Sequence, residues 1–378
     1  MNFEPTLDQQ RFVDLARQFA DEEMRPFADR WDERGEFPRE CFARAAERGL
    51  AGLFAPAEAG GQQIDALTGC MIYEALARGC FATTFGLVVH NNFVAALARG
   101  GSAAARERWL VPAVRGEMLG AFALTEPEAG SDAAAIRSTA RPRDGGYVLD
   151  GVKAWVSNGG VADLYSVMAR TGPGPGARGV SSFVVERTRP GVSFGPRDRK
   201  MAAGALPTCR MVLDAVWVPA DHLLGGEGEG LRAAFRTIDL ARVVVAAMAT
   251  GIAAAALEAA VAYAAERRAF GQPIAEFQGL RFPLADAAAR VEASRWLAYR
   301  AAWLYDRGQP ATSACAMAKL VAVETAESVA SRAVDVFGAY GLLRDYPVER
   351  YLRWAKVAAF LDGTREVQQL VIARDLFA

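Results

Sequence analysis

The stretch Tyr-Val-Leu-Asp-Gly-Val-Lys-Ala-Trp-Val-Ser-Asn, residues 147–158, decides the fold class of this 378-residue chain. Its alternating and β-branched residues are typical of a strand, and similar short runs occur at 164–169, 180–186 and 211–218. Turn clusters such as Arg-Asp-Gly-Gly (143–146) separate them, and the Gly/Pro-rich piece 172–179 is expected to be an exposed hairpin loop. An antiparallel β domain is therefore predicted over residues 119–228.

On both sides of this β region the apolar residues follow the helical period. In residues 1–118, for example, Phe12, Leu15, Ala16 and Phe19 stand three and four positions apart. In residues 229–378, long Ala- and Leu-rich segments predict helices at 231–269, 276–307, 311–337, 347–359 and 364–376. The chain is therefore expected to be an α+β protein, with an N-terminal all-α domain and a C-terminal four-helix bundle.

Composition argues against several classes of function. The formal net charge of −1 leaves no footprint for nucleic acid or for an anionic membrane surface. Five cysteines without a Cys-x-x-Cys pair and two histidines support neither a zinc site nor a disulfide framework, and they suit a reducing cytoplasm. The apolar stretch 243–261 has the length of a membrane span, but it is mostly Ala and Gly, so a buried bundle helix is expected.

Two segments carry residue types that suit a bound heterocycle. The loop Leu124-Thr-Glu-Pro-Glu-Ala-Gly-Ser-Asp132 can present backbone N–H groups and hydroxyls to a ring edge and a phosphate, although such a string is also typical of a surface turn. In the run 153–160, Trp155 and Ser157 fall on one face of a strand. A flat ring beside a hydroxyl suits a stacked heterocycle, and a core tryptophan at a strand end is the plainer interpretation.

Two further segments suit charge recognition. Within residues 266–278, Arg267 and Arg268 lie near a helix end, where they either complement the helix dipole or contact a phosphate. Asp362 and Gly363 end a tight loop, and Thr364 can cap the helix that follows. An acidic residue at that place is, in its plainest interpretation, part of the cap.

Together and in this order, these segments resemble the acyl-CoA dehydrogenase family over nearly the whole chain. The resemblance rests on residues 89–92 (VHNN), 124–132, 153–160, 223–231 (LLGGEGEGL), 266–278, 346–350 (YPVER) and 362–374 (DGTREVQQLVIAR). It implies a helical domain, a middle β-barrel domain and a C-terminal four-helix bundle that enclose FAD. It also implies a homo-oligomer, usually a tetramer, because one chain would not complete its own cofactor site.

The resemblance also implies which residues contact FAD. Trp155 would pack on the flavin, and Ser157, at a place where threonine is common, would bond flavin N5. The loop residues around the flavin ring and pyrophosphate would be Phe122, Leu124, Thr125, Gly130 and Ser131. The adenine dinucleotide part, bound mainly by a neighbouring subunit, would be held by Arg267, Phe270 and Gln278, and further FAD contacts match Asp335, Gly338, Thr364 and Glu366.

For the substrate, Asp239 and Arg242 match the pair that contacts the pantetheine arm of CoA, and Ser131 and Gly363 match further substrate contacts. The chemistry implied is removal of the α-proton of an acyl thioester by a carboxylate, with transfer of the β-hydride to flavin N5. Asp362 matches the position of that base. A backbone N–H at the base would stabilise the developing enolate.

Several residues depart from the family pattern. Asp362 stands where glutamate is usual, and Ala241 occupies the alternative position for a base, so Asp362 is the only carboxylate at either place. The missing methylene shortens reach by roughly 1.5 Å, and a misplacement of about 1 Å can lower a rate a hundredfold. Other departures are Leu361 for Tyr, Gln369 for Arg, Asp335 for Gln, Ala339 for Gly, and the stretch 201–204. They predict an atypical substrate.

Four functions remain open at this stage. The first is dehydrogenation of a short or modest acyl-CoA, with electron-transfer flavoprotein as a possible acceptor. The second uses an acyl-carrier protein, for which Arg187, Arg189, Arg197, Arg199 and Lys200 would form a cationic patch, although such runs are usually a solvated face. The third resembles nitroalkane oxidases, which pair an aspartate base with an arginine seven residues on, where this chain has Gln369. The fourth is a degenerate member without turnover.

Overall fold

The protein is described by a computed structural model covering residues 4–172, 176 and 178–377. The N-terminal region is helical, and polar caps begin several of its helices. Thr6 and Gln9 form a reciprocal capping box, and Asp65 and Ser102 accept hydrogen bonds from the first turns that follow them. The helices are α1 (Leu7–Phe19), α2 (Ala28–Arg34), α3 (Arg39–Glu47), α4 (Ala66–Ala77), α5 (Phe81–Gly100) and α6 (Ala103–Val114).

The middle region forms one sheet in the order β6-β7-β3-β2-β4-β5-β8, with β1 paired to β4. Its strands are β1 (Gly120–Ala123), β2 (Thr139–Arg143), β3 (Gly146–Ser157), β4 (Leu164–Arg170), β5 (Val180–Glu186), β6 (Val192–Phe194), β7 (Thr208–Pro219) and β8 (Leu223–Leu224). Most pairs are antiparallel, as expected, but β1 and β2 each pair with β4 in parallel. Parallel pairing needs a long crossover, and residues 124–163 supply one for β1. The expected hairpin loop at 172–179 lies partly outside the described residues.

The C-terminal region contains long helices and one small hairpin. These elements are α7 (Gly230–Glu266), β9 (Arg268–Ala269), β10 (Gln272–Pro273), α8 (Gln278–Asp306), α9 (Thr312–Phe337), α10 (Val348–Ala358) and α11 (Arg365–Leu376). The helical period therefore predicted these helices closely. The first predicted helix was extended too far, to residue 269, because the β9–β10 hairpin begins directly after Glu266.

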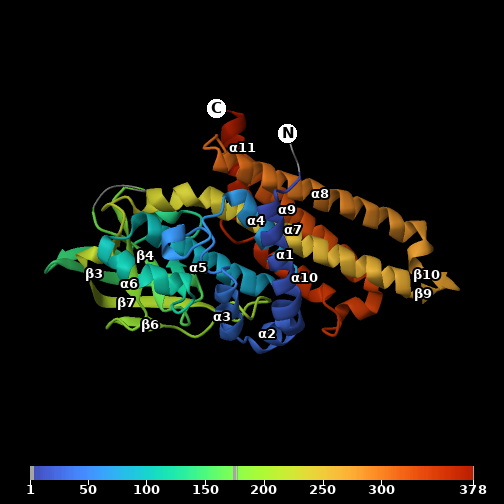
Figure 1. Cartoon of the computed structure of the whole chain (residues 1–378), viewed down its shortest axis with the longest axis horizontal. Coiled ribbons are helices and arrows are strands. Elements are labelled where there is room, and N and C mark those ends of the chain that lie inside the picture. The colour runs from blue at the N-terminus through green and yellow to red at the C-terminus, as the bar shows by residue number, and fades with distance from the viewer. Residues whose placement is uncertain (1–3, 173–175, 177, 378) are drawn as a thin grey trace.

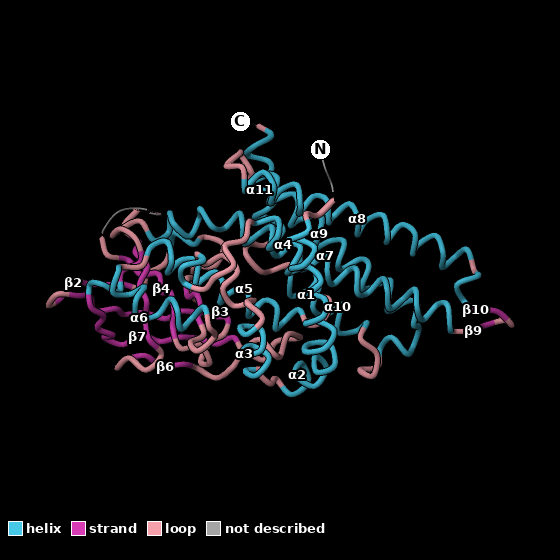
Figure 2. Tube along the Cα trace, in the orientation of Figure 1, coloured by secondary structure: helices cyan, strands magenta, loops and turns pink. Residues whose placement is uncertain are grey.

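Figure 1 shows how these parts are arranged along the longest axis of the molecule. The strands of the middle region lie at one end, the β9–β10 hairpin lies at the other, and the long helices span the distance between them. Figure 2 shows the same segregation, with the strands of the large sheet gathered at one end. The fold is therefore the expected one: a helical domain, a β-sheet domain and a helical bundle.

Helix α7 packs very closely on α4. A Cβ added at Gly251 would lie 2.3 Å from the carbonyl oxygen of Glu74, so only glycine allows this approach. By length and composition alone, Phe81–Gly100 and Gly230–Glu266 could each cross a membrane, but 83% and 89% of their apolar windows are buried inside the protein. Burial on this scale is typical of the core helices that the sequence predicted for residues 243–261.

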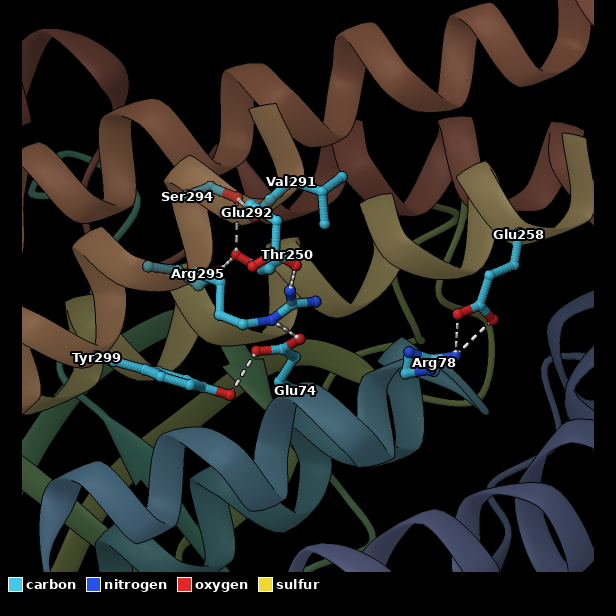
Figure 3. Close-up of polar contacts among 10 residues, drawn as sticks. Glu74, Arg78, Thr250, Glu258, Val291, Glu292, Ser294, Arg295 and Tyr299 are labelled. Carbon is cyan, nitrogen blue, oxygen red and sulfur yellow. Dashed lines mark hydrogen bonds and ion pairs between the residues drawn. The ribbon is translucent and has the colours of Figure 1, made fainter. Parts of the chain in front are cut away.

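A buried polar network also joins α4 to the bundle. The Glu74 carboxylate accepts from Arg295 Nε at 2.8 Å and from the Tyr299 hydroxyl at 2.8 Å, both from α8 (Figure 3). Arg295 also pairs with Glu292, and Arg78 pairs with Glu258 of α7 further along. Since every buried charge here has an opposite partner, the N-terminal domain is fixed against the bundle by specific contacts.

His90 links the helical domain to the start of the sheet. Its ring is buried, Nδ1 accepts from the backbone N–H of Gly120 at 2.9 Å, and Nε2 lies 3.1 Å from the carbonyl oxygen of Ala113. Nδ1 must therefore be unprotonated and Nε2 must donate. Burial lowers the pKa of His90 to about 4, because the ring is desolvated. His90 thus has a structural role within the VHNN motif.

This arrangement predicts a loss of stability in mild acid. The unfolded chain binds a proton at His90 below a pKa of about 6.5, and the folded chain resists it to about 4, so folding weakens as pH falls between these values. We expect His90 to account for about 3 kcal/mol of that loss. Urea unfolding of wild type and His90→Gln from pH 7 to pH 4 measures it. The gap between the two proteins should narrow with acid, and a constant gap would contradict the assignment.

Candidate active site

Trp155 is presented to the outside by an irregularity in β3. The register with β7 shifts between Lys153 and Val156, and Trp155 has a left-handed backbone with φ +55°. This conformation is rare for a large side chain, and the ring is left 64% exposed. Ser157, two residues on, is half-buried, and the buried Val156 lies between them. The predicted pair of a flat ring and a hydroxyl is therefore present at the surface of the sheet.

The 124–131 loop lies against the same strand. The backbone N–H of Ala154 donates to the carbonyl oxygen of Thr125 at 2.8 Å, which places Thr125 beside Trp155. Leu124 and Thr125 are half-buried, whereas Phe122, Gly130 and Ser131 are exposed. The structure thus brings the predicted flavin-ring residues together at one edge of the β domain.

A buried ion pair holds this loop in place. Lys153 is fully buried and Glu126 is 5% exposed, with Nζ 2.7 Å from Oε1. Lys153 also donates to the carbonyl oxygen of Leu124, and the Glu126 carboxylate accepts the backbone N–H groups of Arg137 and Ser138. Burial lowers the pKa of Lys153, and although burial alone would raise that of Glu126, Lys153 and the backbone donors lower it. Both groups are therefore charged and fully paired.

Asp362 lies in the turn between α10 and α11. Asp362 has φ +49° and Gly363 has φ +101°, so two successive residues are left-handed. Burial raises the pKa of the Asp362 carboxyl, and the charges of Lys319 and Arg242 oppose that rise. A carboxylate with a raised pKa and two nearby cations is suited to accept a proton.

Arg242 and Lys319 differ in how their charges are balanced. Arg242 is 6% exposed, and its Nη1 pairs with Asp239 Oδ1 at 3.0 Å. The second Asp239 oxygen accepts from the Thr312 hydroxyl at 2.6 Å, and Arg242 Nε is buried without a partner. Burial lowers the pKa of Lys319 to about 8, and Asp362 opposes that fall. The predicted substrate pair Asp239 and Arg242 therefore lies close to Asp362.

The remaining predicted FAD contacts lie elsewhere. Arg267 stacks over the ring of Tyr340, 5.5 Å from its centroid, beside Gly338 in the chain. Phe270, at the tip of the β9–β10 hairpin, is 96% exposed. Gln278 begins α8, and Asp335 is exposed near Arg332. The β9–β10 hairpin, which carries Phe270, lies at the opposite end of the molecule from the large sheet (Figure 1). One chain thus does not bring its predicted FAD contacts into a single site.

Two expectations change in detail. Thr364 does stand at the N-cap of α11, but its side chain makes no capping hydrogen bond, and Glu366 beside it is exposed. In the basic run, Arg189 pairs with Glu186, Arg197 donates to the Gly35 carbonyl, and Lys200 donates to Leu206 and Thr208. Of this run only Arg189 has a carboxylate partner within the described chain, and Arg187, Arg197 and Arg199 are exposed, so the cationic face that remains is smaller than the five residues predicted.

The exposed residues fit FAD. Trp155 offers a large, strained and uncovered ring beside hydroxyl groups and a glycine-containing loop, and a Cβ added at Gly130 would meet nothing within 4 Å. Phe270 offers a second uncovered ring at the far hairpin. A flat cofactor shared between chains would cover both rings.

Sequence reasoning did not identify Lys319 or Gln368. Lys319 is fully buried in α9, and it donates to the carbonyl oxygens of Gly363 and Ala359. Gln368 is also buried, and its Nε2 donates to the Gly363 oxygen at 3.1 Å. A signal for Lys319 did exist, because it is the only charge in the apolar stretch 314–323 of a predicted helix.

Comparison with known proteins agrees with this geometry. The family models described as the N-terminal, middle and C-terminal domains of acyl-CoA dehydrogenase match residues 6–117, 121–216 and 228–377. A short-chain specific acyl-CoA dehydrogenase of Clostridium acetobutylicum is 38% identical over 100% of both chains. Butyryl-CoA dehydrogenase of Megasphaera elsdenii has a TM-score of 0.96 at 37% identity, over 100% of both chains. A prolyl acyl carrier protein oxidase, AnaB, has a TM-score of 0.93 at 31% identity, covering 99% of this chain and 100% of that one.

The buried pair Glu126–Lys153 leads to a stability prediction. Glu126→Gln leaves the Lys153 ammonium buried and unpaired, so we expect a loss of about 3–5 kcal/mol in the free energy of unfolding. Glu126→Gln combined with Lys153→Met removes both charges and should recover most of that loss. Asp8→Asn breaks the exposed Asp8–Arg11 pair and is the control, expected within about 1 kcal/mol of wild type. Urea unfolding measures the free energy of unfolding of all four proteins. A double variant no more stable than Glu126→Gln would contradict the assignment of the loss to an unpaired buried charge.

Proposed function

The chain belongs to the acyl-CoA dehydrogenase family, and from this membership we propose that it dehydrogenates a short or modest acyl-CoA thioester with Asp362 as the base. It is an oxidoreductase that acts on CH–CH groups and uses FAD. When bound, FAD supplies the acceptor for the β-hydride. The chain itself must supply the base, the orientation of the thioester and the exclusion of water.

The observation that carries the proposal is the setting of Asp362. It is the only carboxylate at either family position for a base, its pKa is raised by burial, and Arg242 and Lys319 stabilise its ionised form. Because a raised pKa makes the carboxylate a stronger base, it suits removal of a proton α to a carbonyl. The base must be ionised to act, so turnover should fall as pH drops through the pKa of Asp362.

The same turn can stabilise the thioester carbonyl. The backbone N–H groups of Asp362 and Gly363 donate no hydrogen bond within the described residues. An N–H at this position can therefore donate to the carbonyl oxygen as negative charge develops on it. Arg242 presents a buried, unpartnered Nε nearby, so it can orient a polar part of the substrate. The sequence expectation for pantetheine contact is consistent with this placement.

The distribution of predicted FAD contacts supports a homo-oligomer, which we propose to be a tetramer. Trp155 belongs to the sheet domain, whereas Phe270 is exposed on the β9–β10 hairpin at the far end of the bundle, so a second copy would bring its hairpin to complete each cofactor site. We further propose a cytoplasmic location, supported by five cysteines that are all buried and free, and electron-transfer flavoprotein as the electron acceptor.

CoA is the favoured carrier of the acyl group. AnaB shows that this fold also serves a prolyl acyl carrier protein, but in the present chain Arg189 is paired with Glu186 and Lys200 donates to internal acceptors, which leaves fewer cations for such a partner. Gln369 lacks the charge that a nitroalkane-oxidase-like site needs, and the intact loop around Trp155 argues against a degenerate member without turnover. The aspartate base favours a substrate whose α-carbon can approach the turn closely.

The role of Asp362 is tested by anaerobic bleaching of the flavin. We expect Asp362→Asn to slow bleaching by about 10²–10⁴-fold, because the amide cannot take a proton. Asp362→Glu should retain measurable bleaching, since it restores a carboxylate. Asp375→Asn, the same change at an exposed position of α11, is the control. Full-rate bleaching by Asp362→Asn with any thioester would sink the assignment.

The carrier is tested by offering matched substrates. The same acyl groups are presented on CoA and on an acyl-carrier protein, and the rate of flavin bleaching is compared. We expect CoA thioesters to be at least about tenfold faster, a difference of about 1.4 kcal/mol in barrier. Faster bleaching with the carrier-protein thioesters would transfer the chain to the class that AnaB represents.

A further inference from the structure

Lys319 is a buried cation that the proposed reaction does not use. It is fully buried in α9, where Ala316, Ala318 and Ala322 are buried beside it. A buried ammonium is unfavourable unless it is hydrogen-bonded and near an opposite charge. Lys319 must therefore have hydrogen-bond acceptors nearby. Both of its hydrogen bonds go to backbone carbonyls in the short segment 359–363.

That segment is the turn that carries Asp362. Lys319 Nζ donates to the carbonyl oxygen of Gly363 at 2.5 Å and lies 3.4 Å from that of Ala359. Gln368 Nε2 of α11 also donates to the Gly363 oxygen, at 3.1 Å. The carbonyls before and after Asp362 are thus tied to α9, and the one after it is also tied to α11.

The turn needs such support because its backbone is unusual. Asp362 and Gly363 are both left-handed, at φ +49° and φ +101°. A non-glycine residue seldom adopts this conformation without outside contacts. Loss of the Lys319 bonds would let Asp362 relax, and the direction of its carboxylate would change.

The charges around the turn indicate that Lys319 also acts on Asp362 electrostatically. From α7, Arg242 and Asp239 face this region, and they pair with each other at 3.0 Å. From α9, Lys319 and Cys315 face it, and Gln368 of α11 is uncharged. Lys319 forms no ion pair within the described chain, so its charge is the least neutralised near Asp362.

We propose that Lys319 is a positioning residue for Asp362, which holds the left-handed turn through the carbonyls of Ala359 and Gly363 and keeps the carboxylate aimed at the substrate. The proposal rests on the proposed role of Asp362 as the base. Lys319 touches neither substrate nor cofactor in it. Its effect is exerted through the backbone of the turn and through the charge that it places beside the carboxylate.

The test compares Lys319→Met with Lys356→Met in the full-length FAD-loaded protein. Lys356 on α10 is half-exposed, pairs with Glu327 and lies over the Phe360 ring, so it undergoes the same substitution beside the turn without a hydrogen bond to the carbonyls of Ala359 and Gly363. We expect Lys319→Met to lower kcat about 100-fold while KM changes little, since a base misplaced by about 1 Å costs that much. The acid limb of the kcat/KM profile should move to higher pH, because a cation that lowers the pKa of Asp362 is gone.

A second readout does not depend on turnover. Hydrogen–deuterium exchange of peptides covering residues 359–368 should speed up far more in Lys319→Met than in Lys356→Met, because only Lys319 donates to the carbonyls of the turn. If wild type bleaches with no thioester, the proposed function fails, and this exchange comparison still decides the role of Lys319. Unchanged exchange, or an unchanged rate and pH profile in an active enzyme, would overturn the proposal.

A further variant, Lys319→Gln, is used in case Lys319→Met does not fold, because glutamine keeps an N–H donor without the charge. We expect it to retain more of the exchange protection than Lys319→Met, with the same shift of the acid limb. If both variants unfold while Lys356→Met remains folded, the proposal is also overturned, because Lys319 would then support the whole bundle rather than the turn.

Discussion

The close approach of α7 to α4 at Gly251 is the constraint on which the rest of the structure depends. With no room for a Cβ beside the Glu74 carbonyl, α7 is fixed against the N-terminal domain along its middle. Its first half then sets Asp239 and Arg242 near the Asp362 turn, and its last residues carry the β9–β10 hairpin outward. A single rigid helix thus determines the distance between Asp239 and Arg242, the predicted substrate pair, and the exposed Phe270.

The fold could be predicted from the sequence because its signals are local. The helices of the bundle follow from spacing, and the Ala- and Gly-rich stretch 243–261 was expected to be buried for the reason that Gly251 now shows: small residues allow close packing. The parallel pairing of β1 with β4 could not be predicted in this way. Nothing in Gly120–Ala123 specifies which strand it joins, since that choice depends on how the crossover 124–163 is packed.

The candidate site was predictable to the extent that its residues form motifs. Thr125, Trp155 and Asp362 stand in quoted stretches, and the structure places the first two together and the third beside Arg242. Lys319 and Gln368 could not be assigned, because their meaning lies in the carbonyls that they reach. Lys319 and Gly363 are 44 positions apart, and a carbonyl leaves no trace in the sequence. A single charged residue in an apolar helix indicates that its side chain has a polar partner elsewhere in the fold, but it does not indicate which residue that partner is.

The two fully buried lysines, Lys153 and Lys319, have their charges balanced in different ways. Lys153 forms an ion pair with Glu126, so the pair has no net charge and it holds the 124–131 loop in place. Lys319 binds carbonyl oxygens instead, and its charge is left to act on Asp362. The charge of Lys319 thus offsets part of the burial that raises the pKa of the Asp362 carboxyl, and a glutamate at this position would gain from it as well.

The backbone supplies a reason for aspartate in particular. At φ +49°, residue 362 lies in the left-handed region, which Asp and Asn occupy more readily than longer side chains do. The shorter side chain thus relieves strain in the turn and at the same time loses roughly 1.5 Å of reach toward a substrate. In the proposed role of Asp362 as the base, aspartate in place of the usual glutamate exchanges reach for backbone fit, and a substrate would compensate by lying closer to the turn.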